Sequence, residues 1–168
     1  GRVIAVASAE GISFHDGQTL ALMGKLEGHE GPVKSIAVNS DGRLIASSGA
    51  DTTVRLWDLQ AAGKQRILRG HTDAVNSVAM SKDGLKLVTS GADKTVRLWD
   101  VASGQQIRTF EGHTDEITSV VFCSGDDLIA SGGWDNTIRI WDLEGHCKKI
   151  LHHASWVRHL TASPNGKM

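Results

Sequence analysis

Histidine and aspartate, two of the side chains used in acid–base catalysis, recur in this sequence at a fixed spacing. The histidines of three Gly-His dipeptides lie 42 residues apart, at His29, His71 and His113. Aspartates follow each of them after 22 residues, at Asp51, Asp93 and Asp135. An enzyme needs one set of catalytic residues, whereas this histidine–aspartate pair occurs three times at the same spacing. The recurrence favours a structural role over general bases or metal ligands, and we expect no enzymatic activity.

A second group of potential ligands lies near the end of the chain and comprises His146, Cys147, His152, His153 and His159. Such side chains can ligate zinc. Their spacing fits no compact zinc finger, however, and two of them fall in a loop between expected strands. No glycine-rich loop opens a helix to hold a phosphate. We therefore predict neither a metal nor a cofactor.

The period also orders the elements that position these residues. Trp-Asp dipeptides at Trp57, Trp99 and Trp141 keep the spacing of 42 residues. Each period holds three apolar runs and a polar one, separated by short Gly- and Asp-containing turns. The alternation of apolar and polar residues predicts strands, at 33–38, 44–46, 54–57 and 66–68, at 75–80, 87–89, 96–99 and 106–110, and at 117–122, 128–130, 138–141 and 148–151. We expect an all-β fold of four-stranded antiparallel units.

This pattern resembles the WD-repeat family of β-propellers over essentially the whole chain. The resemblance implies blades of four strands, each with a buried hydrogen-bonded tetrad. Carried over by position, the tetrads are His29, Ser47, Asp51 and Trp57, then His71, Thr89, Asp93 and Trp99, then His113, Ser131, Asp135 and Trp141. It further implies a non-enzymatic scaffold for protein–protein interaction.

The flanking segments depart from the regular repeats, which we place at 28–69, 70–111 and 112–151 within a single propeller segment, 1–168. Residues 1–27 align as a degenerate repeat, with Val6, Glu10 and His15 at the tetrad positions. Residues 152–168 begin a further repeat, with a strand expected from Val157 to Thr161 and a turn at 164–166. The chain therefore holds about four blades' worth of strands, a partial ring or half of a larger one.

Three ways of completing the ring stay open at this point. The chain begins at Gly1 without Met, and our first choice is that it is part of a longer protein with seven or eight blades. Alternatively, it is a structural unit of which two copies pair their open edges and close one eight-bladed ring as a homodimer. In the third, Val157 to Thr161 joins the strands after Gly1 and closes a four-bladed ring.

The resemblance also implies where partners bind, namely on the narrow top face of the propeller. The corresponding positions vary between repeats, in contrast to the tetrads. One of them holds Trp134 where the other repeats have Ala50 and Ala92. Tryptophan and arginine are enriched in binding hot spots, so we expect Trp134 to anchor a protein or peptide partner. The predicted partner-binding residues are Trp134, Trp156, Arg158, Lys34, Asn76, Glu116 and Thr118.

The charge balance argues against other partners. Lys and Arg total 18 and Asp and Glu 19, so no basic surface points to nucleic acid or an anionic membrane. Arg55, Arg97 and Arg139 recur with the period, and we expect them in surface ion pairs. No apolar run approaches the ~20 residues of a membrane helix. Two cysteines are too few for a disulfide framework, and we expect an intracellular protein, cytoplasmic or nuclear.

Overall fold

The computed structural model describes residues 3–61, 64–123 and 125–163. Within these ranges the chain forms fifteen strands in four antiparallel sheets, which we call blades 1 to 4. Blade 1 comprises β1 (Val3–Ser8), β2 (Gly11–Asp16) and β3 (Leu22–Leu26), and blade 2 β4 (Val33–Val38), β5 (Leu44–Gly49), β6 (Val54–Asp58) and β7 (Gln65–Leu68). Blade 3 comprises β8 (Val75–Met80), β9 (Lys86–Gly91), β10 (Val96–Asp100) and β11 (Gln106–Phe110), and blade 4 β12 (Ile117–Cys123), β13 (Leu128–Gly133), β14 (Thr137–Asp142) and β15 (Cys147–His152).

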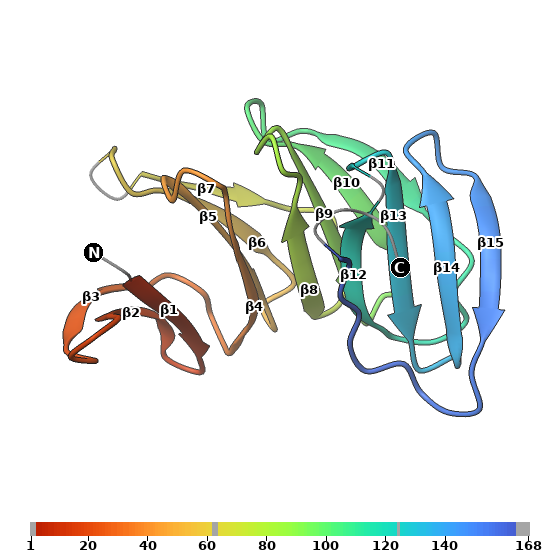
Figure 1. Cartoon of the computed structure of the whole chain (residues 1–168), viewed down its shortest axis with the longest axis horizontal. Helices are drawn as coiled ribbons and strands as arrows, with labels where there is room; N and C mark the ends of the chain where they lie inside the picture. Colours follow the sequence, from red (N-terminus) through yellow and green to blue (C-terminus); the bar gives the residue numbers. More distant parts are fainter. Residues whose placement is uncertain (1–2, 62–63, 124, 164–168) are drawn as a thin grey trace.

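The four blades stand side by side along an open arc in chain order (Figure 1). Each strand pairs with its neighbour in sequence, and blades 2, 3 and 4 have four strands while blade 1 has three. This arrangement confirms the predicted all-β fold and its four-stranded units. No helix of the described residues is long and apolar enough to cross a membrane.

Tight turns join the second and third strands of each regular blade. The residue after the turn aspartate has a positive φ in all three: 66° at Thr52, 65° at Lys94 and 61° at Asn136. The aspartate stabilises this turn because its Oδ1 accepts a hydrogen bond from the backbone N–H two residues further on, as Asp93 does from Thr95. The turn therefore fixes the aspartate that the tetrad uses.

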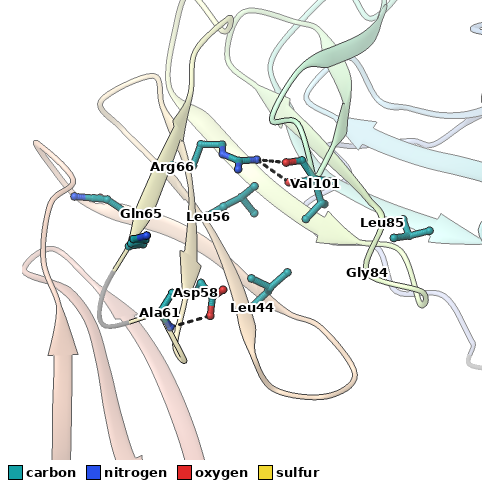
Figure 2. Close-up of a pocket in the computed structure, with 11 residues that line it drawn as sticks. Leu44, Leu56, Asp58, Ala61, Gln65, Arg66, Gly84, Leu85 and Val101 are labelled. Carbon is teal, nitrogen blue, oxygen red and sulfur yellow. Dashed lines mark hydrogen bonds between the residues drawn. The ribbon is translucent and has the colours of Figure 1, made fainter.

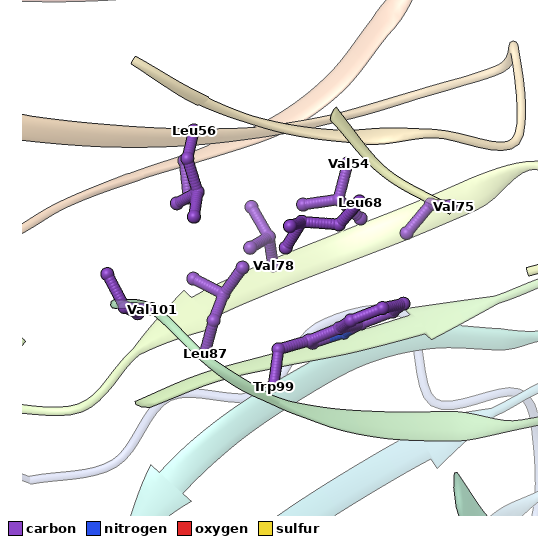
Figure 3. Close-up of a cluster of buried hydrophobic side chains, with 9 residues drawn as sticks. Val54, Leu56, Leu68, Val75, Val78, Leu87, Trp99 and Val101 are labelled. Atoms are coloured by element: carbon purple, nitrogen blue, oxygen red, sulfur yellow. The ribbon is translucent and has the colours of Figure 1, made fainter. Parts of the chain in front are cut away.

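The hydrophobic core lies between successive blades. Figure 3 shows Val54, Leu56 and Leu68 of blade 2 facing Val75, Val78, Leu87 and Trp99 of blade 3. In the same way Phe110 of blade 3 packs edge-on against Trp141 of blade 4, with ring centroids 5.8 Å apart. Each regular blade thus buries its tryptophan against the preceding blade, and a blade is stable only with neighbours.

The segment predicted as a strand at Val157 to Thr161 is not one. It runs beside β12 and is held there by single hydrogen bonds, from Val157 N to Gly133 O (3.0 Å) and from Leu160 N to Ser119 Oγ (2.9 Å). A strand requires a ladder with a neighbouring strand, and within the described ranges no strand forms one with this segment.

The proposed closure of a four-bladed ring is also absent from the described part of the chain. There β1 pairs with β2 alone, and the segment after β15 lies at the other end of the arc (Figure 1). The ring is partial. The aligned residues Gly1 and Arg2, and the turn expected at 164–166, lie outside the described residues.

Candidate functional site

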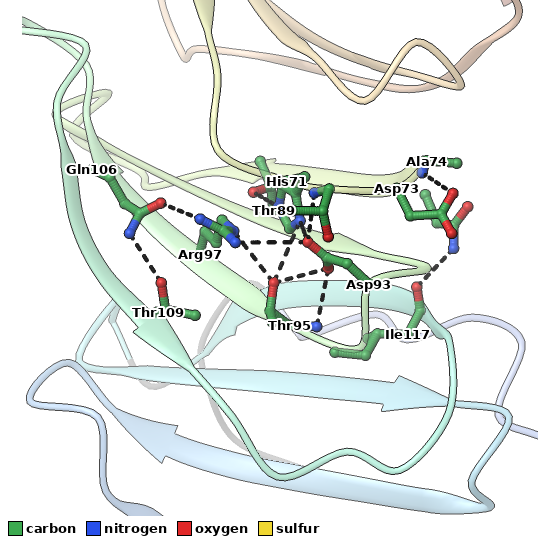
Figure 4. A network of polar contacts seen from close by, with 12 residues as sticks. His71, Asp73, Ala74, Thr89, Asp93, Thr95, Arg97, Gln106, Thr109 and Ile117 are labelled. Atoms are coloured by element: carbon green, nitrogen blue, oxygen red, sulfur yellow. Dashed lines mark hydrogen bonds and ion pairs between the residues drawn. The ribbon is translucent and has the colours of Figure 1, made fainter.

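The interior of blade 3 contains a chain of hydrogen bonds that begins at a buried tryptophan. Trp99 Nε1 donates to Thr89 Oγ1 (2.9 Å), which lies 2.8 Å from His71 Nε2. His71 Nδ1 in turn lies 2.8 Å from Asp93 Oδ2 (Figure 4). Because the carboxylate can only accept, Nδ1 carries the proton and the threonine hydroxyl donates to Nε2.

Blades 2 and 4 contain the same arrangement at the corresponding positions. The indole-to-hydroxyl distances are 2.9 Å in blade 2 and 2.8 Å in blade 4, and the hydroxyl-to-imidazole distance is 2.8 Å in both. The imidazole-to-carboxylate distances are 2.9 and 2.7 Å. The residues are His29, Ser47, Asp51 and Trp57 in blade 2, and His113, Ser131, Asp135 and Trp141 in blade 4. Every member has a partner, so the network can lie inside the blade.

A fifth side chain, which the sequence analysis missed, completes each network. Thr53, Thr95 and Thr137 each donate from Oγ1 to the turn aspartate at 2.8 Å. Their spacing of 42 residues was a usable signal. The network also requires a glycine at position 91, which the sequence analysis did not single out. A Cβ added to Gly91 would lie 2.9 Å from Ala74 O and 3.0 Å from His71 Nδ1.

The electrostatics of the tetrads favour a neutral histidine and an ionised aspartate. Burial raises the pKa of Asp51, but hydrogen bonds from Glu30 N, Thr53 and His29 outweigh it and lower the pKa to about 2. The pKa of Asp93 is likewise about 2. Burial lowers the pKa of His29 below 6.5 although Asp51 opposes this. The hydroxyls donate to histidine and accept from tryptophan, so none is free to act as a nucleophile.

We had expected the periodic arginines in surface ion pairs, and this prediction was wrong. They lie beside the tetrads instead. Arg55 is 6% exposed and lies 3.8 Å from Asp51 Oδ2, and Arg97 lies 3.7 Å from Asp93 Oδ2. The guanidinium of Arg139 stands 5.9 Å from the ring centroid of Trp141. Arg55 and Arg97 each reach the tetrad aspartate four residues earlier, while Arg139 stands over the tetrad tryptophan.

Blade 1 lacks this network. In the strand register His15 pairs with Ile4, as Trp57 pairs with Ile45 in blade 2. Its imidazole contacts only near neighbours, Ser13 Oγ at 3.0 Å and Leu20 O at 3.1 Å. Blade 1 therefore depends on packing rather than on a tetrad.

Two exposed tryptophans, one in blade 4 and one in the segment that follows it, form a pair. Trp134 lies in the turn between β13 and β14, and Trp156 follows β15. Their rings stack with centroids 5.4 Å apart and an angle of 26° between planes, and the residues are 40% and 56% exposed. Backbone bonds hold them there, from Trp134 N to Glu116 O and from Val157 N to Gly133 O.

The other predicted binding residues lie around these tryptophans or further along the same side of the blades. Lys34 and Arg158 are exposed, and Glu116 is half-buried. Asn76 and Thr118 are half-buried. Asn76 Nδ2 links blade 3 to blade 4 by donating to Ile117 O (3.1 Å), and Thr118 Oγ1 links blade 4 to the segment after β15 by donating to Val157 O. We call this side, defined by Trp134, Trp156, Arg158, Lys34, Asn76, Glu116 and Thr118, the top face.

The His/Cys cluster of the sequence is dispersed. Among the described residues no three His, Cys, Asp or Glu side chains come together as a metal site. His146 is exposed and its Nδ1 lies 3.0 Å from Asp142 Oδ2. Cys123 is half-buried, and burial raises the pKa of its thiol.

A groove of about 500 Å³ opens between blades 2 and 3, at the strand ends opposite the tetrad turns. Its lining includes Leu44, Leu56, Leu85 and Val101, and Arg66 spans it to the carbonyl oxygens of Val101 and Ala102 (Figure 2). The corresponding groove between blades 3 and 4 has Lys86 and Asp127 in place of Leu44 and Leu85. The first groove is therefore a secondary apolar surface that the boundary between blades 3 and 4 does not repeat.

These blades, with their repeated tetrads, define a β-propeller segment. The family model described as "WD domain, G-beta repeat" matches the chain three times, at 20–58, 63–100 and 104–142. The chain belongs to the WD-repeat family, whose members are typically non-enzymatic scaffolds. The structure and the family thus agree on the class of protein.

Several relatives match the chain over one or two repeats. A periodic tryptophan protein 2 homolog of Schizosaccharomyces pombe is 55% identical over 42 residues, 25% of this chain and 5% of the relative. The small ribosomal subunit protein RACK1y of Oryza sativa is 60% identical over 35 residues, 21% and 10% respectively. Eukaryotic translation initiation factor 3 subunit I of Phaeosphaeria nodorum is 41% identical over 46 residues, 27% and 13%. The aligned segments cover a small part of each relative's length.

Proposed function

We propose that the chain is a non-enzymatic scaffold that binds a peptide or partner domain on its top face, with Trp134 as the anchor. The observation that carries the proposal is the stacked, exposed pair of Trp134 and Trp156. Exposed apolar surface of two tryptophans is unfavourable in water, and a partner that covers it gains binding free energy. Lys34, Asn76, Glu116, Thr118 and Arg158 surround or extend the anchor and shape specificity.

The family supports protein partners in general, and the names of the relatives suggest which kind. A small ribosomal subunit protein, a translation initiation factor subunit and a ribosome biogenesis protein BOP1 homolog are among them. We propose that this chain, too, serves a multiprotein assembly of the ribosome or translation machinery inside the cell.

The test is affinity capture with the wild-type chain and with Trp134→Ala. Alanine stands at the corresponding positions of blades 2 and 3, Ala50 and Ala92, so the substitution should leave the fold intact. We expect a partner to be captured by the wild type and lost with Trp134→Ala. Retention of every partner by the variant would reject Trp134 as the anchor.

A second candidate is self-assembly, in which two copies of the chain close one eight-bladed ring. It is favoured by the uncovered face of blade 4, where Leu151 is 38% exposed although the corresponding Leu68 and Phe110 are each 2% exposed. The mass in solution decides it. A dimer of the chain supports this candidate, and a monomer at high concentration excludes it.

A further inference from the structure

We infer that the tryptophan patch, formed by Trp134, Trp156 and Glu116, binds a basic side chain, lysine or arginine, of the partner protein. This inference rests on the proposed function and specifies the chemistry of the partner at that site. It depends on the stacking of the two rings, on the acidic residues Asp115 and Glu116 and on the finding that, within the described ranges, no cation stands over either ring.

The aromatic surface is suited to a cation. Tryptophan provides the strongest cation–π interaction of the side chains, over its ring face and within about 6 Å of the centroid. Trp134 and Trp156 stack on each other at 26°, and the two residues are 40% and 56% exposed to a partner. Within the described ranges, the one cation recorded over an aromatic ring is Arg139 over Trp141, inside blade 4. The patch is therefore not used by a cation of these residues.

Two carboxylates provide the complementary charge. Glu116 is the backbone neighbour of Trp134, since its carbonyl oxygen accepts from Trp134 N at 2.9 Å. Asp115 precedes it and accepts from Glu116 N at 2.9 Å. Neither carboxylate belongs to any ion pair found among the described residues. Two acidic residues in the backbone segment bonded to Trp134 favour lysine or arginine as the partner group and disfavour acidic peptides and the phosphates of RNA.

Arg158 fixes where the basic side chain lies. Trp156 and Arg158 flank the buried Val157 and are both exposed, so the Arg158 guanidinium is a cation two residues from Trp156. A partner cation near Arg158 would be repelled. The basic side chain therefore lies at the Trp134 end of the patch, next to Glu116.

The experiment is fluorescence anisotropy with the full chain and labelled short peptides that differ at one central residue, Arg, Lys, Gln, Glu or Phe. We expect the Arg and Lys peptides to bind about tenfold more tightly than the Gln peptide, with affinity falling as salt rises. Trp134→Ala should abolish this preference and Glu116→Gln should reduce it. Asp73→Asn is the matched control, because Asp73 occupies the position of Asp115 one blade away from the tryptophans.

Three results would overturn the inference. Equal affinity for the Phe and Arg peptides would make the patch a plain apolar anchor. Tighter binding of single-stranded RNA than of basic peptides, lost with Trp134→Ala, would make it a base-stacking site. If no basic peptide binds while partner capture still depends on Trp134, the scaffold proposal stands and the charge assignment fails; if capture is also independent of Trp134, both fail.

Discussion

The tetrads inside blades 2, 3 and 4 differ from the top face in how strictly the sequence repeats. The tetrad positions hold the same residue types in all three blades, and their distances agree within a few tenths of an ångström. The top-face positions differ from blade to blade, as Ala50, Ala92 and Trp134 show. A network in which each atom needs its partner tolerates little change, whereas an exposed position is free to vary. Repetition therefore marks stability here, and its failure marks the candidate binding site.

The largest effect should come from breaking the interior. Trp99 is 1% exposed, packs on blade 2 and donates to Thr89. Trp99→Ala should lower the free energy of unfolding by about 3–5 kcal/mol, through lost burial and an orphaned hydroxyl. Urea denaturation measures this. A loss below about 1 kcal/mol would mean that blade 3 does not depend on its tetrad tryptophan.

Acidification should weaken all three tetrads together. The pKa of Asp51 and of Asp93 falls from 3.8 to about 2 on folding, so their contribution is complete above pH 3.8 and lost as the pH falls toward 2. The pKa of His29 and of His113 lies below 6.5, so these histidines also stabilise the fold above 6.5 and less so as the pH falls. Each aspartate should contribute up to about 2 kcal/mol. Stability that is constant from neutral pH to below 3.8 would contradict this account.

A smaller effect is expected from changing one carboxylate to an amide. Asp93 accepts from His71, Thr95 and Thr72 N, and Asp93→Asn replaces one acceptor oxygen with a donor. The free energy of unfolding should fall by about 1–3 kcal/mol. Asp73→Asn, at an exposed aspartate of the same blade, is the control and should change it by less than about 0.5 kcal/mol. If both substitutions lowered the free energy of unfolding equally, the tetrad aspartate would be no more important for stability than a surface aspartate.

The smallest effect should come from the groove between blades 2 and 3. Leu85 is 58% exposed, and the corresponding position of blade 4 is Asp127. Leu85→Asp should change the free energy of unfolding by no more than about 0.5 kcal/mol. A thermal or urea unfolding curve checks this. A loss above about 2 kcal/mol would show that the groove belongs to the core.

The sequence predicted all twelve strands of the three regular blades, although the second strand of each blade is longer than predicted, as β5 (Leu44–Gly49) is against 44–46. By contrast, β4, β8 and β11 have the predicted bounds, because periodic burial and turn aspartates define them locally. The strand at Val157 to Thr161 was predicted wrongly, since a local pattern does not reveal whether a ladder partner is present. Arg55 was placed at the surface because charge suggests solvent, but the fold buries it beside Asp51.

The candidate site was only partly accessible from the sequence. The contrast of Trp134 with Ala50 and Ala92 is visible in the repeat alignment. Its stacking on Trp156 depends on how two blade positions approach each other in space, which no sequence spacing encodes. The hydrogen bonds from Asn76 to blade 4 and from Thr118 to the segment after β15 likewise depend on how these parts approach each other in space.

The central claim is that residues which break the repeat bind partners while those which keep it hold the fold. It is tested most directly by measuring, for Trp134→Ala, both the Kd for the captured partner and the free energy of unfolding, with Asp73→Asn as a control from the exposed surface of blade 3. The account predicts that Trp134→Ala raises Kd about tenfold or more and changes unfolding by less than about 0.5 kcal/mol. An unchanged Kd, or a loss of stability like that expected for Trp99→Ala, would contradict it.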